Sequence, residues 1–158
     1  MALLETSAEN LQQLPLGRIA AFDYGEKRIG VALSDPLQVL ATPFRTLGNA
    51  GKKSVLRELS ALLSDNACCC VVFGMPYHLH GDAGDKARQV EQLAVDLAKR
   101  ITLPIFCWDE RWTTVRAHQT LQELGESPSR NKARVDRMAA AFILQAFLDR
   151  IAAVRSHR

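Results

Sequence analysis

Four carboxylates stand where the chain leaves or enters an apolar segment. Asp23 follows RIAAF, Asp109 and Glu110 follow PIFCW, and Asp136 precedes MAAAFIL. If such acids converge they repel one another, and a divalent cation is the usual reason that a protein tolerates this. Oxygen-only ligands favour Mg²⁺ or Mn²⁺ over zinc. Ions held in this way activate water and stabilise the leaving oxygen in phosphodiester hydrolysis, so the pattern predicts a metal-dependent nuclease.

Each of the three aspartates also has a purely structural explanation. Asp23 can cap the following turn, and Asp109 can cap the next helix. Asp136 can pair with Arg134 or Arg137 on a solvated face. Three acids at the ends of separate elements favour the metal site, with Asp23 shared between the ions. The sequence leaves open which of Asp109 and Glu110 is the ligand.

Cations accompany the acids. Arg28 follows the turn after Asp23, and Arg111 follows Glu110. Each can hold a phosphate or the charge of the transition state, or it can form an ion pair with the neighbouring acid. A basic cluster around Asp136 favours contact with a nucleic-acid backbone, although a solvated basic face is the alternative. Its members are Arg130, Lys132, Arg134 and Arg137.

The segment GMPYHLHGDAG, residues 74–84, has no periodicity and is expected to be a loop. Its glycines Gly74, Gly81 and Gly84 suit a backbone that passes close to a strand end. No GK[ST] is present, so it is not a phosphate loop. His78 and His80 lack further nitrogen or sulfur ligands nearby, which favours a surface loop over a zinc site.

The elements that position these residues alternate between strand and helix patterns. Strands are expected at 18–24 and 28–34, joined as a hairpin by YGEK, then at about 39–46, 68–74 and 104–109. Apolar spacing predicts helices at 52–64, 85–100, 113–124 and 133–151, with a link at 125–132. This order predicts an α/β fold with a mixed central sheet and helices on both faces. In such sheets the working groups gather at the carboxyl ends of the strands.

The length of 158 residues suits one domain, expected at 17–152, with a loose N-terminal extension at 1–16 and a tail at 153–158. Cys68, Cys69, Cys70 and Cys107 lie in apolar runs without zinc spacing, so they are expected to be reduced core residues. No signal peptide or membrane span is apparent, which predicts a cytoplasmic protein with no membrane partner. The net charge of +3 permits a nucleic-acid partner without requiring one.

Four motifs in this order resemble the YqgF (RuvX) family of RuvC-like nucleases. They are DYGEKRIGVALSD, GMPYHLHGDAG, WDERWTT and VDRMAAAFILQ, and the resemblance runs from about residue 18 to 151. The acids that match the family motifs are Asp23, Glu110 and Asp136, with Asp109 also in the DER motif. The resemblance implies a ribonuclease-H-like fold. The N-terminal extension has no counterpart in the pattern, and SPSRNKAR is less densely basic than the family leads us to expect.

The resemblance implies hydrolysis of structured RNA in maturing the 5′ end of precursor 16S ribosomal RNA, within pre-ribosomal particles. It leaves two alternatives: a Holliday-junction resolvase acting on branched DNA, and a catalytically weak RNA-binding assembly factor. The acid-glycine hairpin FDYGEKRIGVAL also resembles the phosphate hairpin of actin-like ATPases. Those proteins close two such domains around a nucleotide, whereas 158 residues supply one. Because all three motif acids are present, an active enzyme is the favoured interpretation.

Overall fold

Five strands form one mixed sheet in the computed structural model, which describes residues 3–76, 84–113, 119–120, 122–123 and 132–157. The strand order is β3-β2-β1-β4-β5, so β1 lies at the centre. β1 pairs antiparallel with β2 and parallel with β4, and β5 continues the parallel half. The strands are β1 (Arg18–Tyr24), β2 (Arg28–Ser34), β3 (Ala41–Gly48), β4 (Cys68–Met75) and β5 (Ile105–Asp109). This confirms the expected α/β fold and its hairpin.

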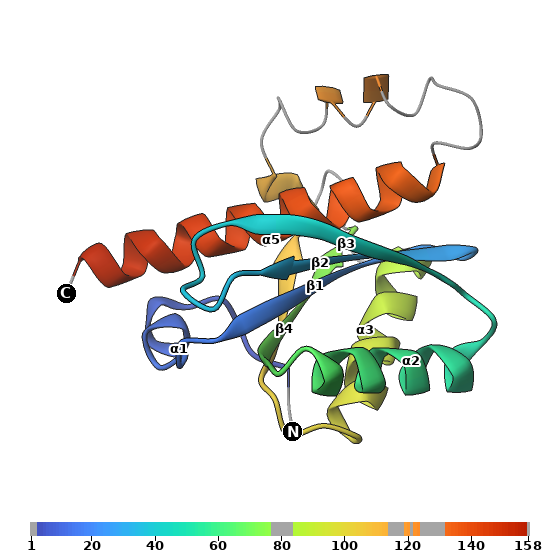
Figure 1. The fold of residues 1–158 in the computed structure, drawn as a ribbon, viewed down its shortest axis with the longest axis horizontal. Helices are drawn as coiled ribbons and strands as arrows, with labels where there is room; N and C mark the ends of the chain where they lie inside the picture. Colours follow the sequence, from blue (N-terminus) through green and yellow to red (C-terminus); the bar gives the residue numbers. More distant parts are fainter. Residues whose placement is uncertain (1–2, 77–83, 114–118, 121, 124–131, 158) are drawn as a thin grey trace.

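Helices cover both faces of the sheet (Figure 1). α2 (Lys52–Asp65) and α3 (Asp85–Ala98) pack on one face, and α5 (Lys132–Ser156) with the short α1 (Ala8–Gln12) packs on the other. Alternation along β1 divides the core between them. Ala20 and Phe22 face α2 and α3, whereas Ile19 and Ala21 face α5.

Some boundaries differ from those expected. β3 runs two residues later than predicted and tolerates Pro43 because it is an edge strand. α5 extends to Ser156 and buries Val154, so the helix continues into the segment expected to be a tail. Most of the predicted helix at 113–124 lies outside the described residues. So does most of the predicted link at 125–132.

The N-terminal segment packs on the domain, in contrast to the loose extension expected from sequence. The backbone N–H of Leu4 donates to the carbonyl of Ile105 at 2.8 Å, which adds a bridge to the outer edge of β5. Ser7 caps α1, whose Leu11 is fully buried against the α5 face. A helix of five residues has too few turns to show the periodicity of an amphipathic helix. The sequence therefore contains no pattern from which α1 could be predicted.

All four cysteines are free thiols. Cys68 and Cys70 are buried in β4, and burial raises the pKa of Cys68 to about 11. Burial likewise raises the pKa of Cys107 in β5 to about 11. These thiols are therefore weak nucleophiles at neutral pH. In the described part of the chain, no helix combines the length and apolar character needed to cross a bilayer.

Candidate active site

Asp23 stands at the carboxyl end of the central strand. It pairs across the hairpin with Gly30, and the carboxylate is half-buried. Burial is the main cause that raises the pKa of Asp23 well above its usual range, followed by the charge of Glu110 and a side-chain hydrogen bond with it. A hydrogen bond between two carboxyl groups requires a proton on one of them. Asp23 and Glu110 thus lie close together, and the charge of Glu110 opposes ionisation of Asp23.

Glu110 reaches Asp23 by crossing over Gly74. A Cβ on Gly74 would lie 3.0 Å from Glu110 Oε1 and 2.5 Å from Ile143 Cδ1. Gly74 follows Phe73, the β4 residue paired with Phe22, so it lies next to the strand end that carries Asp23. The absence of a side chain at Gly74 thus leaves room for both Glu110 and α5. The groups that approach Gly74 are side chains, whereas the expectation for GMPYHLHGDAG was a backbone passing close to the strand end.

Asp136 comes to the same end of the sheet from the N-terminal part of α5, just after its first turn. The helix backbone passes so close to β2 that a Cβ on Gly30 would lie 1.9 Å from the Asp136 carbonyl oxygen. The Asp136 carboxylate accepts a hydrogen bond from Arg28 Nε at 2.7 Å, and its charge contributes to raising the pKa of Asp23. The three motif acids therefore influence one another, with Asp136 neutralised by Arg28.

Asp109 has a different environment from Glu110. Its carboxylate is almost fully buried and accepts from the backbone and side chain of Arg111, the latter from Nε at 2.9 and 3.0 Å. Burial alone would raise the pKa of Asp109, but the bonds and charge of Arg111 outweigh it and hold the pKa below its usual range. Asp109 begins the 3-10 turn η1 (Glu110–Trp112) as its cap. The capping explanation therefore fits Asp109, and Glu110 is the member of the pair that faces Asp23.

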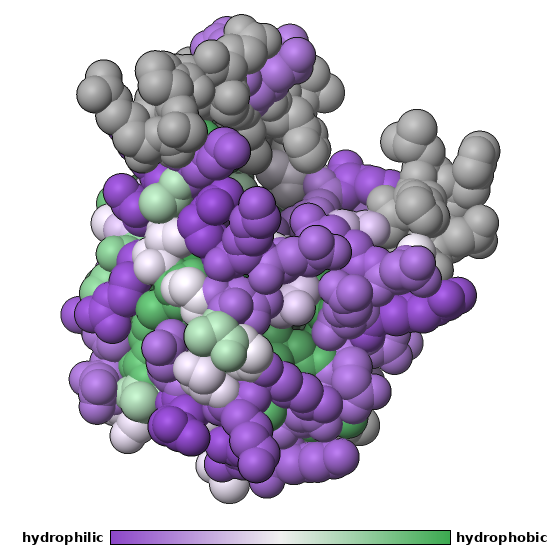
Figure 2. Space-filling view, turned by 90° about the vertical axis from the view of Figure 1, so that its right-hand side faces the viewer, coloured by the Kyte–Doolittle hydropathy of each residue, from purple (hydrophilic) through white to green (hydrophobic). Residues whose placement is uncertain are grey.

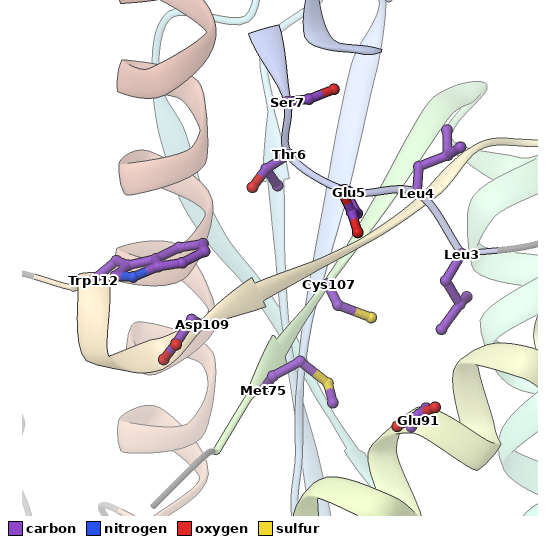
Figure 3. Close-up of a pocket in the computed structure, with 10 residues that line it drawn as sticks. All are labelled: Leu3, Leu4, Glu5, Thr6, Ser7, Met75, Glu91, Cys107, Asp109 and Trp112. Carbon is purple, nitrogen blue, oxygen red and sulfur yellow. The ribbon is translucent and has the colours of Figure 1, made fainter. Parts of the chain in front are cut away.

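Asp109 also lines a cavity of about 540 Å³ on the outer side of β5 (Figure 3). The N-terminal segment passes along one side of this cavity, and Met75, Cys107 and Trp112 complete the wall beside Asp109. Trp112 is 54% exposed and meets Trp108 edge-to-face, with ring centroids 5.0 Å apart. Trp108 itself is buried against α5, as core packing predicts.

The acids fit a divalent cation by chemistry. Asp23, Glu110 and Asp136 offer only carboxylate oxygens, which suit Mg²⁺ or Mn²⁺. Burial, followed by the charge of Glu110, raises the pKa of Asp23, and a bound cation would oppose both effects. In the present arrangement, no three His, Cys, Asp or Glu side chains of the described residues are grouped closely enough to hold an ion. One of the three carboxylates, that of Asp136, forms an ion pair with Arg28 in this arrangement.

The predicted basic cluster divides into two kinds of residue. Lys132 and Arg134 are exposed in the first turn of α5. Arg137 instead donates to Thr46 Oγ1 at 3.1 Å, which ties α5 to β3. Arg130 lies outside the described residues, as do Gly81, His78 and His80.

Gly84 and Lys86 mark the beginning of α3. Gly84 is the N-cap residue of the helix. The charge of the exposed Lys86, in its first turn, lowers the pKa of Asp23 and so lies near the acids. Sequence reasoning did not identify Lys86. The only available signal was a lysine directly after the glycine loop that follows β4.

A family model described as "RuvX: Holliday junction resolvase" matches residues 17–150. The chain belongs to the RuvX family. A relative in Roseiflexus sp. (strain RS-1), named "Putative pre-16S rRNA nuclease", is 42% identical over 133 residues, which span 84% of this chain and 94% of the relative. A relative in Koribacter versatilis (strain Ellin345) bears the same name and is 39% identical, over 85% of this chain and 88% of its own length.

Solved structures place this RuvX chain in the RuvC-like, ribonuclease-H fold. T. thermophilus RuvC in complex with a Holliday junction substrate matches with a TM-score of 0.58 at 12% identity, covering 85% of this chain and 96% of RuvC. The yeast mitochondrial Holliday junction resolvase Ydc2 also has a TM-score of 0.58, at 13% identity over 95% of this chain and 88% of its own. At these identities the likeness establishes the fold.

Proposed function

We propose that this RuvX chain is a divalent-metal-dependent nuclease that hydrolyses phosphodiester bonds in structured RNA, and that it processes the 5′ end of precursor 16S ribosomal RNA in the cytoplasm. The observation that carries the proposal is the meeting of Asp23 and Glu110 at the carboxyl end of the central strand, with Asp136 beside them. The names of the RuvX relatives support the choice of substrate.

Asp23, Glu110 and Asp136 are the residues that would hold Mg²⁺ or Mn²⁺. When bound, such ions activate water and stabilise the leaving oxygen of a phosphodiester. Asp109 is assigned a positioning role, because its bonds to Arg111 fix the turn from which Glu110 projects. Arg28 holds Asp136 until positive charge enters the site, and it is then available to a substrate phosphate.

Lys132 and Arg134 are assigned to the substrate backbone, together with Arg130. Their charges lie at the end of α5 that carries Asp136, so a phosphate backbone crossing the acids meets them next. This end of the molecule, where α5 begins, presents a largely hydrophilic surface (Figure 2). Such a surface suits a highly charged, hydrated partner such as RNA in a pre-ribosomal particle.

A second candidate is cleavage of branched DNA. The family description and the fold shared with a RuvC bound to a Holliday junction favour it. The two substrates are separated by incubating labelled precursor 16S RNA and a labelled four-way DNA junction with the protein. Each is tested with Mg²⁺, with Mn²⁺ and with EDTA, beside the Asp23→Asn variant. The nuclease proposal requires cleavage of the RNA that EDTA and Asp23→Asn both abolish; cleavage of the junction alone would select the second candidate.

A further inference from the structure

A second cavity lies directly behind Asp23, on the other face of the sheet. Successive side chains of a strand point to opposite faces, so Tyr24 turns away from the acids and packs against the α2 and α3 layer. There it lines a cavity of about 220 Å³ between the two helices, which we call the Tyr24 cavity. The cavity and the acids therefore share one strand end.

The walls of the Tyr24 cavity combine an apolar floor with amide groups. Val55 of α2 and Leu93 of α3, both buried, form the floor. Three amide side chains surround it: Asn49, Gln89 and Gln92. An amide both donates and accepts hydrogen bonds, as the edge of a nucleobase does, and asparagine and glutamine are common readers of bases.

The polar wall is held in place before any ligand arrives. Asn49 Nδ2 donates to the carbonyl of Gly25 at 3.0 Å, and Gln92 Nε2 donates to Asp96 Oδ1 at 3.2 Å. Lys52 forms an ion pair with the same Asp96, which joins the beginning of α2 to α3. Gln89 is exposed on α3, and its side-chain amide has no hydrogen-bond partner among the described residues. Because the wall is already fixed and the Gln89 amide is available for hydrogen bonding, the cavity suits a flat ring with polar groups at its edge.

The size of the cavity selects the ligand class. It is smaller than the roughly 300–1,000 Å³ of ordinary small-molecule sites, so it suits one ring system with the sugar and phosphate left outside. Among the described residues no carboxylate lines it, so its described wall places no negative charge against a polyanion. We propose that the Tyr24 cavity receives one unpaired nucleobase of the RNA strand whose backbone crosses Asp23 and Glu110. This inference rests on the proposed nuclease function, because that function supplies the strand.

Such a cavity gives the enzyme a means of choosing where to cut. RNA is recognised mainly at single-stranded loops and ends, where an unstacked base can lie on an aromatic ring while amides bond its edge. A base held at Tyr24 fixes the register of the strand on the neighbouring Asp23. The cavity is therefore assigned a specificity role and no part in the chemical step.

Binding tests the inference without requiring cleavage. In Asp23→Asn protein without divalent cations, AMP, CMP, GMP and UMP are titrated while the side-chain amide signals of Asn49, Gln89 and Gln92 are followed by NMR. We expect at least one nucleotide to shift these signals and ribose 5-phosphate to leave them in place. Absence of shifts with all four nucleotides would overturn the inference.

Affinity for RNA distinguishes a base within a strand from a free nucleotide. Gln89→Ala should weaken binding of at least one fluorescein-labelled single-stranded homopolymer roughly tenfold, the effect of losing one amide–base contact. Gln13→Ala, at an exposed glutamine next to α1, should have no effect. Tyr24→Leu serves as a second variant, with its folding checked by circular dichroism.

If mononucleotides bind but all variants hold RNA like the parent, the cavity serves free nucleotides and the inference is wrong. If the cavity binds RNA bases but the parent cleaves no RNA, the nuclease proposal fails and the base site stands.

Discussion

Gly30 and Asp136 touch through their backbones: a Cβ on Gly30 would lie 1.9 Å from the carbonyl oxygen of Asp136. This contact allows the N-terminal part of α5 to lie on the hairpin opposite Asp23. It also means that the position of one proposed ligand depends on the absence of a side chain at another residue.

Replacing Gly30 by alanine should therefore destabilise the protein by about 3 kcal/mol or more, because the new methyl group meets rigid backbone. Urea unfolding measures the loss. Gly48→Ala in β3 is the matched control, since nothing lies within 4 Å of its added Cβ, and it should change stability by less than about 0.5 kcal/mol. Equal stability of the two variants would show that α5 does not approach β2 so closely.

Asp23→Asn should reduce cleavage by orders of magnitude while RNA affinity stays equal or rises, because the charge that would hold the ions is gone. The control is Asp65→Asn, at an exposed aspartate of α2, which should cleave like the parent. A fully active Asp23→Asn protein would place the catalytic acids elsewhere.

The same Asp23→Asn variant should be more stable than its parent at neutral pH without divalent cations. The folded-state pKa of Asp23 is raised, chiefly by burial, so the folded protein binds this proton more tightly than the unfolded chain does. The charged form therefore costs stability above the raised pKa, and the cost disappears as the pH falls below the ordinary range for aspartate. Thermal unfolding from pH 8 down to pH 4 should show the gain shrinking; a gain that grows with acidity would contradict this cause.

Replacing Arg130 and Lys132 together by alanine should weaken RNA binding and reduce the slope of its logarithmic salt dependence by about 2. With two phosphate contacts fewer, RNA binding releases fewer counterions. Turnover at saturating substrate should change little. In the control variant Arg57 and Arg100 are both replaced by alanine. This removes the same charge from exposed positions on α2 and beyond the end of α3. A similar loss in both pairs would indicate general electrostatic attraction in place of a defined path.

Asp35 organises the turn between β2 and β3 and should make stability depend on acid pH. Its carboxylate accepts from the backbone N–H groups of Leu40, Val39 and Leu37 at 2.8, 2.9 and 3.1 Å. These bonds, that of Leu40 first, lower the pKa of Asp35 in the folded protein. The contribution of the ionised Asp35 to the free energy of unfolding is therefore complete at pH values above the ordinary pKa range of aspartate. It is lost as the pH falls through the lowered pKa of the folded protein.

Asp35→Asn removes this contribution. Urea unfolding should show the variant less stable than the parent at pH 7, with the difference shrinking towards pH 3. The control is Glu58→Gln, which removes a charge from an exposed position of α2, away from this turn. Its stability difference from the parent should not shrink as the pH falls. A difference that is constant with pH would assign the effect to shape alone.

Local patterns were sufficient to predict the hairpin, α2 and α3, because turn residues and apolar spacing act over a few residues. Local patterns could not predict contacts between residues that are distant in the sequence. Arg28 and Asp136 are 108 positions apart, and nothing in the sequence selects this pair over Arg134 or Arg137. The choice between Asp109 and Glu110 depends on where β5 ends, since a shift of one residue exchanges the faces on which the two side chains lie. Sequence boundaries are rarely that accurate.

At both margins of the sheet the chain itself hinders the addition of further strands. On one side Leu4 occupies part of the outer edge of β5, and on the other Pro43 removes a donor from β3. Open edges invite pairing between molecules and lead to aggregation. The N-terminal segment therefore acts as a safeguard of solubility, and a shortened protein lacking residues 1–16 should precipitate at concentrations where the full chain stays dispersed.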